Sequence, residues 1–177
     1  MQWSDNYRRA ARYNAWINQS LLEASLSLPE SEQNKDLDVF FHSLVGSWNH
    51  IMVGDLFWLN RLAKIFPILD DKINNWPKPK ALDEILYGSL NNLASARQAL
   101  DELIIEWCDF LRENDCESRL EYFTSQEELR VKPLPEIMQH LFNHQTHHRG
   151  QITALLSQLG VEYGTTDFIA MPGDDCP

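Results

Sequence analysis

The stretch PEIMQHLFNHQTHHRGQITALLSQLG, residues 135–160, predicts a long helix that carries four of the six histidines of the chain. Its apolar residues recur at three- and four-residue spacing, the period at which side chains share one face of a helix. Pro135 suits the first turn of a helix, and Gly160 suits the left-handed position that commonly follows the last turn. We therefore expect a helix between these two residues.

Three earlier segments show the same spacing, and they cover about Trp3–Leu26, Val39–Ile65 and Leu82–Leu111. The middle one is apolar nearly all round, which is typical of a buried central helix. Four long helices with short connections predict an all-α four-helix bundle. The whole chain, residues 1–177, is long enough for a single domain with a substantial core.

The remaining segments are predicted to connect the helices. Residues 66–80 contain three prolines and are expected to be non-helical. Between residues 115 and 133, the short alternating runs RLEYFTS and ELRVK predict a small hairpin or two irregular extended pieces before the last helix. Thr166 is a candidate cap for one short turn in the tail.

Composition excludes several classes of protein. Fifteen basic against 26 acidic residues give a net charge of −11, which would repel a phosphate backbone, so we expect no nucleic-acid partner. Cys108, Cys116 and Cys176 show no CxxC spacing, which argues against a disulfide framework and a thiolate zinc site. No segment reaches the roughly 18 apolar residues of a membrane span, and the first residues lack a signal sequence. These features predict a cytoplasmic protein.

Helical geometry separates the four histidines of the last predicted helix, since each residue advances roughly 100° around the axis. His148 lies within the apolar stripe and His144 at its edge, flanked by Gln151, whereas His140 and His147 lie progressively further out. Two histidines four residues apart project from one face and can share one metal ion. We therefore expect His144 and His148 to be metal ligands, with His140 a marginal candidate and His147 in solvent.

His50, in the predicted helix 39–65, is the candidate third ligand. It shares one sector of that helix with the small residues Ser43, Gly46, Ser47 and Gly54. The large side chains occupy the other side, and they are Phe41, Leu44, Trp48, Met52, Leu56 and Leu59. A sector without bulk can admit an ion, a water or a substrate. Close packing of a neighbouring helix against the glycines explains the same pattern equally well.

Three imidazoles on one ion would leave an open coordination position, the arrangement of a catalytic site. Such an ion lowers the pKa of a bound water or thiol. HQTHH resembles the metalloprotease pattern HExxH, but Gln145 replaces the glutamate that acts as general base, which disfavours peptide hydrolysis. Asp55 points away from His50 on the helix. A pair of histidines that bond only to each other, in a purely structural bundle, is the alternative.

Three segments in the same order resemble the DinB family, within the DinB/YfiT-like superfamily. They are FFHSLVGSWNHIMVGDLFWLNRL (40–62), HLFNHQTHHRGQITALLSQLG (140–160) and YGTTDFI (163–169), and YRRAARYNAWINQSLLEA (7–24) resembles the family's first helix. The resemblance implies an up-down-down-up four-helix bundle, a three-histidine site for zinc or nickel, and a homodimer. Carried over position by position, the metal ligands are His50, His144 and His148.

The resemblance also implies a class of reaction. Some superfamily members are thiol transferases or isomerases that use bacillithiol, mycothiol or glutathione. A metal-dependent thiol S-transferase with a small-molecule substrate is therefore expected, and the family's name implies stress-related expression. Because many members have no assigned reaction, a non-catalytic metal- or ligand-binding protein with the same three histidines is the alternative.

Several other residues have expected positions. Arg149 and Gln151 follow the family's HHRGQ pattern, and helical geometry places Arg149 opposite the core stripe, as an ion-pair or dimer residue. Trp48 and Trp58 are expected in the core. Asn49 and Asn143 either orient the ligands from behind or lie on the surface. His42 lies about 12 Å from His50 along a helix, too far to share its ion.

Overall fold

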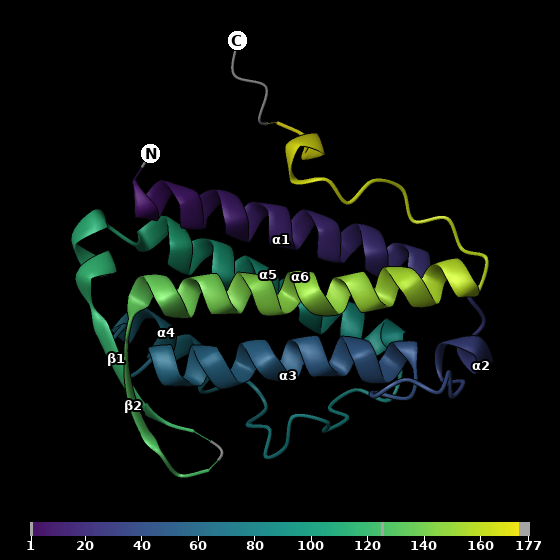
Figure 1. The fold of residues 1–177 in the computed structure, drawn as a ribbon, viewed down its shortest axis with the longest axis horizontal. Coiled ribbons are helices and arrows are strands. Elements are labelled where there is room, and N and C mark those ends of the chain that lie inside the picture. Colours follow the sequence, from purple (N-terminus) through teal and green to yellow (C-terminus); the bar gives the residue numbers. More distant parts are fainter. Residues whose placement is uncertain (1, 125, 174–177) are drawn as a thin grey trace.

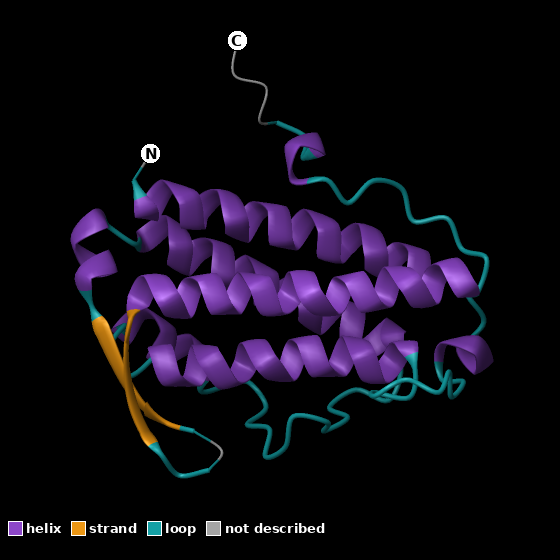
Figure 2. Cartoon of the chain, in the orientation of Figure 1, coloured by secondary structure: helices purple, strands orange, loops and turns teal. Residues whose placement is uncertain are grey.

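A computed structural model describes residues 2–124 and 126–173, and it consists of helices with one attached hairpin (Figures 1 and 2). The four long helices are α1 (Trp3–Leu26), α3 (Leu44–Leu62), α5 (Leu90–Phe110) and α6 (Leu134–Gln158). The short helices are α2 (Glu30–Gln33), α4 (Pro67–Ile73), and the 3-10 turns η1 (Glu113–Glu117) and η2 (Phe168–Ala170). The strands are β1 (Arg119–Phe123) and β2 (Leu129–Pro133).

The long helices form a closed ring of contacts. Helix α1 packs along α5 and α6, and α3 packs along the same two helices from the other side. Helices α1 and α6 run in one direction and α3 and α5 in the other (Figure 1). The backbone N–H of Ser4 donates to Glu113 at 3.1 Å, which joins the start of α1 to the chain just beyond α5. The predicted all-α bundle with up-down-down-up order is confirmed.

Helix α3 is the central helix, as its all-round apolar sequence predicts. Eight of its apolar side chains have zero exposure, and they are Leu44, Trp48, Ile51, Met52, Val53, Leu56, Leu59 and Leu62. Burying an aliphatic side chain of this size contributes about 1.5–3 kcal/mol, so this helix supplies much of the stability of the bundle. Among the described residues, no helix is both long and apolar enough to cross a lipid bilayer.

The start of α3 differs from the prediction. Helix α1 has the expected bounds, but α3 begins at Leu44 rather than Val39. Ser43 caps it, because its side-chain oxygen accepts a hydrogen bond from the N–H of Gly46 at 3.1 Å. Just upstream, Asp38 and His42 have left-handed backbone angles, with φ of 56° and 62°, which no helix continues through.

The start of α5 was predicted eight residues too early. Leu82 and Leu86 have helical spacing, yet the helix begins at Leu90. The backbone before it bonds to α3 instead, since Leu86 N and Tyr87 N donate to Asn49 Oδ1 at 2.8 and 2.9 Å. A tertiary contact has replaced a local helical turn here.

The connections contain more structure than expected. Residues 67–73 form α4, because a proline at the first helical position is compatible with a helix. Helix α6 begins at Leu134, one residue before Pro135, and Gly160 follows it with a φ of 72°, as predicted. The short turn in the tail follows Asp167, without a side-chain cap, so Thr166 is not its cap.

The predicted hairpin is confirmed, and it is attached to α3. Strands β1 and β2 pair antiparallel, from Arg119 opposite Pro133 to Phe123 opposite Leu129. The guanidinium of Arg61 lies 4.7 Å from the ring of Trp58 and 4.9 Å from that of Tyr122. Trp58 is therefore half-buried beneath the hairpin, whereas Trp48 lies in the core as expected.

The described cysteines are free thiols within the fold. Cys108 and Cys116 are both buried, and Cys116 belongs to η1. Cys176 lies outside the described residues.

Candidate metal centre

Three histidines from two helices meet on one side of the bundle. His50 on α3 lies with its Nε2 atom 3.1 Å from Nε2 of His144 and 3.0 Å from Nε2 of His148, both on α6. One ring nitrogen from each residue lies within 4.8 Å of the others. The structure thus brings together the three residues that the sequence singles out, although 94 residues separate His50 from His144.

Glycine creates the space that this meeting requires. A Cβ atom at Gly54 would lie 2.6 Å from Cε1 of His144, so only a glycine lets the ring approach α3 this closely. A Cβ atom at Gly46 would lie 1.9 Å from the carbonyl oxygen of Phe41. Gly54 therefore fits both explanations of the small sector around His50, since it admits a candidate ligand and lets α6 pack closely. Gly46 packs instead against the chain that leads into α3.

Hydrogen bonds on the far side of two rings fix where their protons lie. Nδ1 of His50 is 2.8 Å from the carbonyl oxygen of Leu82, which can only accept, so Nδ1 carries the hydrogen. Nδ1 of His148 lies 2.7 Å from Oε1 of Gln151 and donates in the same way. In the neutral forms of both rings, the two Nε2 atoms are unprotonated and their lone pairs face one another.

Burial favours these neutral forms. Together with the smaller effect of nearby histidines, it lowers the pKa of His144 to about 3 and that of His148 to about 4. Burial also lowers the pKa of His50. Unprotonated nitrogens at 3.0 Å repel one another unless a cation lies between them. Around an ion bound at about 2.0–2.1 Å, ligand nitrogens lie about 2.9–3.4 Å apart for angles of about 90–109°, so the two separations from His50 Nε2 fit a shared metal.

Asn49 supports His50 indirectly. Its side chain is fully buried and makes four hydrogen bonds, accepting from Leu86 N and Tyr87 N and donating to Val45 O and Tyr87 O. It thereby holds the loop whose Leu82 carbonyl orients His50. Asn49 and Asn143 were predicted either to orient the ligands or to lie on the surface. Asn49 has the orienting role, whereas Asn143 is exposed on α6.

Phe41 borders the cluster, which its sequence position did not predict. Helical spacing places it on the side of α3 opposite His50, but Phe41 precedes the helix and its ring stacks on His50, with centroids 3.9 Å apart. It also meets the ring of His148 edge-on at 5.6 Å. The capping serine at position 43 is the signal that would have placed Phe41 outside the helix.

The other histidines lie outside the cluster. His140 packs against Trp58, with ring centroids 5.0 Å apart, and His147 is exposed. His42 is exposed and lies 3.5 Å from a carboxylate oxygen of Asp36. The marginal candidate His140 is therefore not part of the group of three, and His42 and His147 lie apart from it, as predicted.

The prediction for Arg149 was wrong. It is only 4% exposed, and it donates to Asn14, to Asn18 at 3.2 Å and to Gln145 at 3.1 Å. Its long side chain reaches between α6 and α1, where asparagines accept its hydrogens. Burial lowers its pKa to about 10, still well above neutrality, so it is a cation within the bundle.

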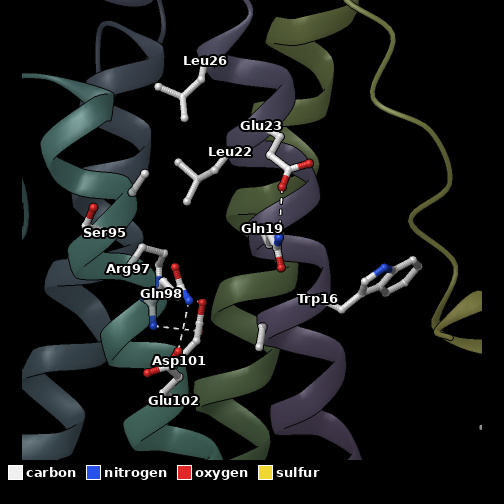
Figure 3. A pocket seen from close by; sticks show the side chains of 12 residues that line it. Trp16, Gln19, Leu22, Glu23, Leu26, Ser95, Arg97, Gln98, Asp101 and Glu102 are labelled. Atoms are coloured by element: carbon white, nitrogen blue, oxygen red, sulfur yellow. Dashed lines mark hydrogen bonds and ion pairs between the residues drawn. The ribbon is translucent and has the colours of Figure 1, made fainter. Parts of the chain in front are cut away.

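Arg149 is part of a polar network inside the bundle. The network comprises Asn14, Asn18, Asp55, Arg97, Asp101, Gln145 and Arg149. Oδ2 of Asp55 accepts from Arg97 and from Gln145, both at 2.5 Å. Arg97 also donates twice to Asp101, and these two residues lie at the base of a groove of about 340 Å³ between α1 and α5 (Figure 3).

Asp55 is sealed within this network. It has no exposure, and burial raises its pKa to about 6. Among the buried side-chain atoms of the network in the described residues, Asp55 Oδ1 and Asn14 Nδ2 lack a hydrogen-bond partner. Asp55 thus faces away from the histidines, as predicted, and cannot act as a base there.

Comparisons with known proteins agree with the fold and the motifs. The model of the DinB family matches residues 1–173. Protein DinB of Bacillus subtilis (strain 168) is 27% identical over 179 residues, which span 93% of this chain and 92% of that protein. The crystal structure of a DinB-like protein from Bacillus cereus ATCC 10987 is similar with a TM-score of 0.57. It has 19% identity and covers 86% of this chain and 90% of that chain. At that identity, the likeness concerns the fold.

Proposed function

We propose that this chain, which belongs to the DinB family, is a metal-dependent thiol S-transferase whose ion is held by His50, His144 and His148. The observation that carries the proposal is the pair of unprotonated Nε2 atoms of His50 and His148, which face each other at 3.0 Å. Zinc or nickel is the proposed ion, because both bind neutral imidazole well.

A bound ion would lower the pKa of a low-molecular-weight thiol and hold it as the thiolate. The sulfur would then form a bond to an electrophilic carbon of the second substrate, and the leaving group would depart with its electron pair. Leu82 and Gln151 keep two imidazoles in the ligand orientation through their Nδ1 hydrogens. Phe41 covers one face of His50 and excludes water from it.

Thiol transfer fits the site better than hydrolysis because of what surrounds the histidines. Hydrolysis at such a centre ordinarily uses a carboxylate base beside the ion. Gln145 stands where a zincin has its glutamate, and both Gln145 and Asp55 have zero exposure inside the polar network. A thiol loses its proton when it binds a metal, so the transfer requires no such base.

The test is a thiol panel on metal-loaded protein. Glutathione, bacillithiol and mycothiol would each be supplied with 1-chloro-2,4-dinitrobenzene, and chloride release would be followed. We expect turnover with at least one thiol, lost after chelation and in His148→Ala but retained in His147→Ala. Stoichiometric metal without turnover would instead support the rival function, a non-catalytic metal- or ligand-binding protein.

The remaining features of the proposal rest on the family resemblance. A homodimer is proposed, and light scattering would then give a mass near twice the 20.6 kDa of the chain. Cytoplasmic location and stress-related expression stay predictions.

A further inference from the structure

Two cavities flank the aromatic segment Val39–Phe41 beside the metal centre. The smaller, of about 160 Å³, lies between this segment and the second half of α6. Its walls are mainly apolar, with Val39, Phe40, Phe41, Ala154 and Leu155, and the polar residues Ser47, Gln151 and Gln158 complete them. The larger, of about 350 Å³, has mixed walls, in which Asn34, His42 and Asp83 lie beside apolar residues such as Val45 and Ile85.

The smaller cavity shares two residues with the histidine cluster. Phe41 lines the cavity and stacks on His50 at 3.9 Å. Gln151 also lines it, and its Oε1 accepts from Nδ1 of His148 at 2.7 Å. The cavity therefore adjoins the cluster across these two side chains, and a molecule held by the ion would reach past them to enter it.

The aromatic segment is held in shape before any ligand binds. It is bracketed by the left-handed residues Asp38 and His42, and neither is a glycine. Backbone hydrogen bonds close it, with Leu37 N to His42 O at 2.7 Å and His42 N to Val39 O at 2.8 Å. This arrangement leaves Phe40 84% exposed at the cavity rim, with its ring edge-on to that of Phe41 at a centroid distance of 4.9 Å. Backbone conformations of this kind cluster at ligand sites.

We propose that the smaller cavity binds the apolar group of the small molecule that occupies the metal centre. The group is an uncharged aromatic or branched aliphatic one about the size of a benzene ring, since an apolar cavity of about 150 Å³ accepts benzene. The larger cavity on the other side of Phe41 suits such a group less well, because its mixed walls include the carboxylate of Asp83. The link to the metal rests on the proposed function, whereas the apolar cavity does not.

The first test uses metal-free protein, so it is independent of the metal. Benzyl alcohol would be titrated while the methyl signals of Val39, Ala154 and Leu155 are followed by NMR. We expect saturable shifts at these methyls. Ala154→Leu, at an exposed helical position that tolerates leucine, fills the cavity and should abolish the shifts.

Gly88→Leu is the matched control. Gly88 lines the larger cavity and has open space where a Cβ atom would be added, so its substitution should leave the shifts unchanged. Absence of saturable shifts, or shifts that persist in full in Ala154→Leu, would overturn the apolar cavity as a binding site.

The second test joins the cavity to the metal. In cobalt-substituted protein, ethanethiol and benzyl mercaptan would be compared through the thiolate-to-cobalt absorption band. We expect benzyl mercaptan to bind at least about tenfold more tightly than ethanethiol. Burying its ring removes as much apolar surface from water as several methylene groups, and each such group raises the affinity about fourfold. In Ala154→Leu, the ratio of benzyl mercaptan affinity to ethanethiol affinity should fall at least about tenfold, while ethanethiol affinity is unchanged. Because both thiols are measured in both proteins, the difference in their acidity cancels.

The two failures are distinguishable. If the protein binds no metal, the proposed function fails and the benzyl alcohol titration still decides the cavity. If metal binds but Ala154→Leu leaves the thiol ratio unchanged, the cavity does not serve the metal centre.

Discussion

The histidine cluster and the polar network lie on two sides of the same helix pair, one residue apart. Gly54 of α3 faces His144 of α6, and Asp55 pairs with Gln145. In the network, donors meet acceptors, so its polar groups are largely satisfied by protein. In the cluster, unprotonated nitrogens face one another and only a cation satisfies them. A buried polar residue therefore points to ligand binding when its neighbours leave it without a complementary partner.

Arg97→Ala would break the network and has the largest expected effect. It leaves the buried carboxylates of Asp55 and Asp101 without their cation, so the free energy of unfolding should fall by about 3–5 kcal/mol in urea denaturation. Arg130→Ala removes an exposed ion pair with Glu128 and should cost about 0–1 kcal/mol. Equal losses in the two variants would show that the network does not hold the helices together.

Gly54→Ala would disturb the cluster while it leaves the network in place. The added Cβ would lie 2.6 Å from Cε1 of His144, so the ring must move. We expect metal affinity to fall by about 10- to 100-fold, the range seen when ligand orientation is lost. The control Gly150→Ala adds a methyl into open space on α6 and should stabilise the helix by about 0.5–1 kcal/mol. Unchanged metal affinity in Gly54→Ala would contradict the close approach of the two helices.

Asn49→Ala tests whether the loop before α5 belongs to the metal centre. Without this side chain, Leu86 N and Tyr87 N lose their acceptor, and the Leu82 carbonyl no longer holds His50. Metal titration should show an affinity about tenfold lower. Asn143→Ala, on the exposed face of α6, should bind metal as the wild type does. A loss of stability alone, with metal affinity intact, would assign Asn49 a purely structural role.

The two regions should also respond to pH in opposite directions. Burial lowers the pKa of His148 from 6.5 to about 4, so its stabilising contribution is present above 6.5 and is lost as the pH falls toward 4. Burial raises the pKa of Asp55 from 3.8 to about 6, so its contribution is present below 3.8 and is lost as the pH rises through 6.

Urea denaturation of the metal-free protein across this range would separate the two contributions. His148→Ala should flatten the loss of stability on the acid side, and Asp55→Asn should remove the loss on raising the pH. If both variants keep the pH profile of the wild type, neither group titrates as its burial requires.

Local sequence signals predicted the parts of the molecule that depend on local physics. The bounds of α1 and Gly160 after α6 follow from spacing and turn chemistry. The hairpin was one of two predicted forms, and the meeting of His50 with the α6 pair was implied by the family resemblance. Long-range partners decided the rest. Asn49 captures the backbone of residues 86 and 87 that spacing assigns to a helix.

Arg149 shows that long-range partners also decide where a side chain lies. Helical geometry places it outside the core stripe, yet Asn14 and Asn18 on α1 supply the acceptors that bring it inside. Nothing within α6 reveals those partners. The polar network was therefore beyond reach of the sequence, whereas the candidate site was not, because its residues share one helix face or a sector without bulk.

Metal analysis of the purified protein, expressed with zinc and nickel supplied, tests directly whether the histidine cluster, unlike the polar network, binds a metal ion. We predict about one ion per chain in the wild type and in His147→Ala, and none in a folded His148→Ala variant, because three imidazoles form the site. A wild type that binds neither metal, or a His148→Ala variant that retains a full equivalent, would contradict the assignment of the cluster as a metal centre.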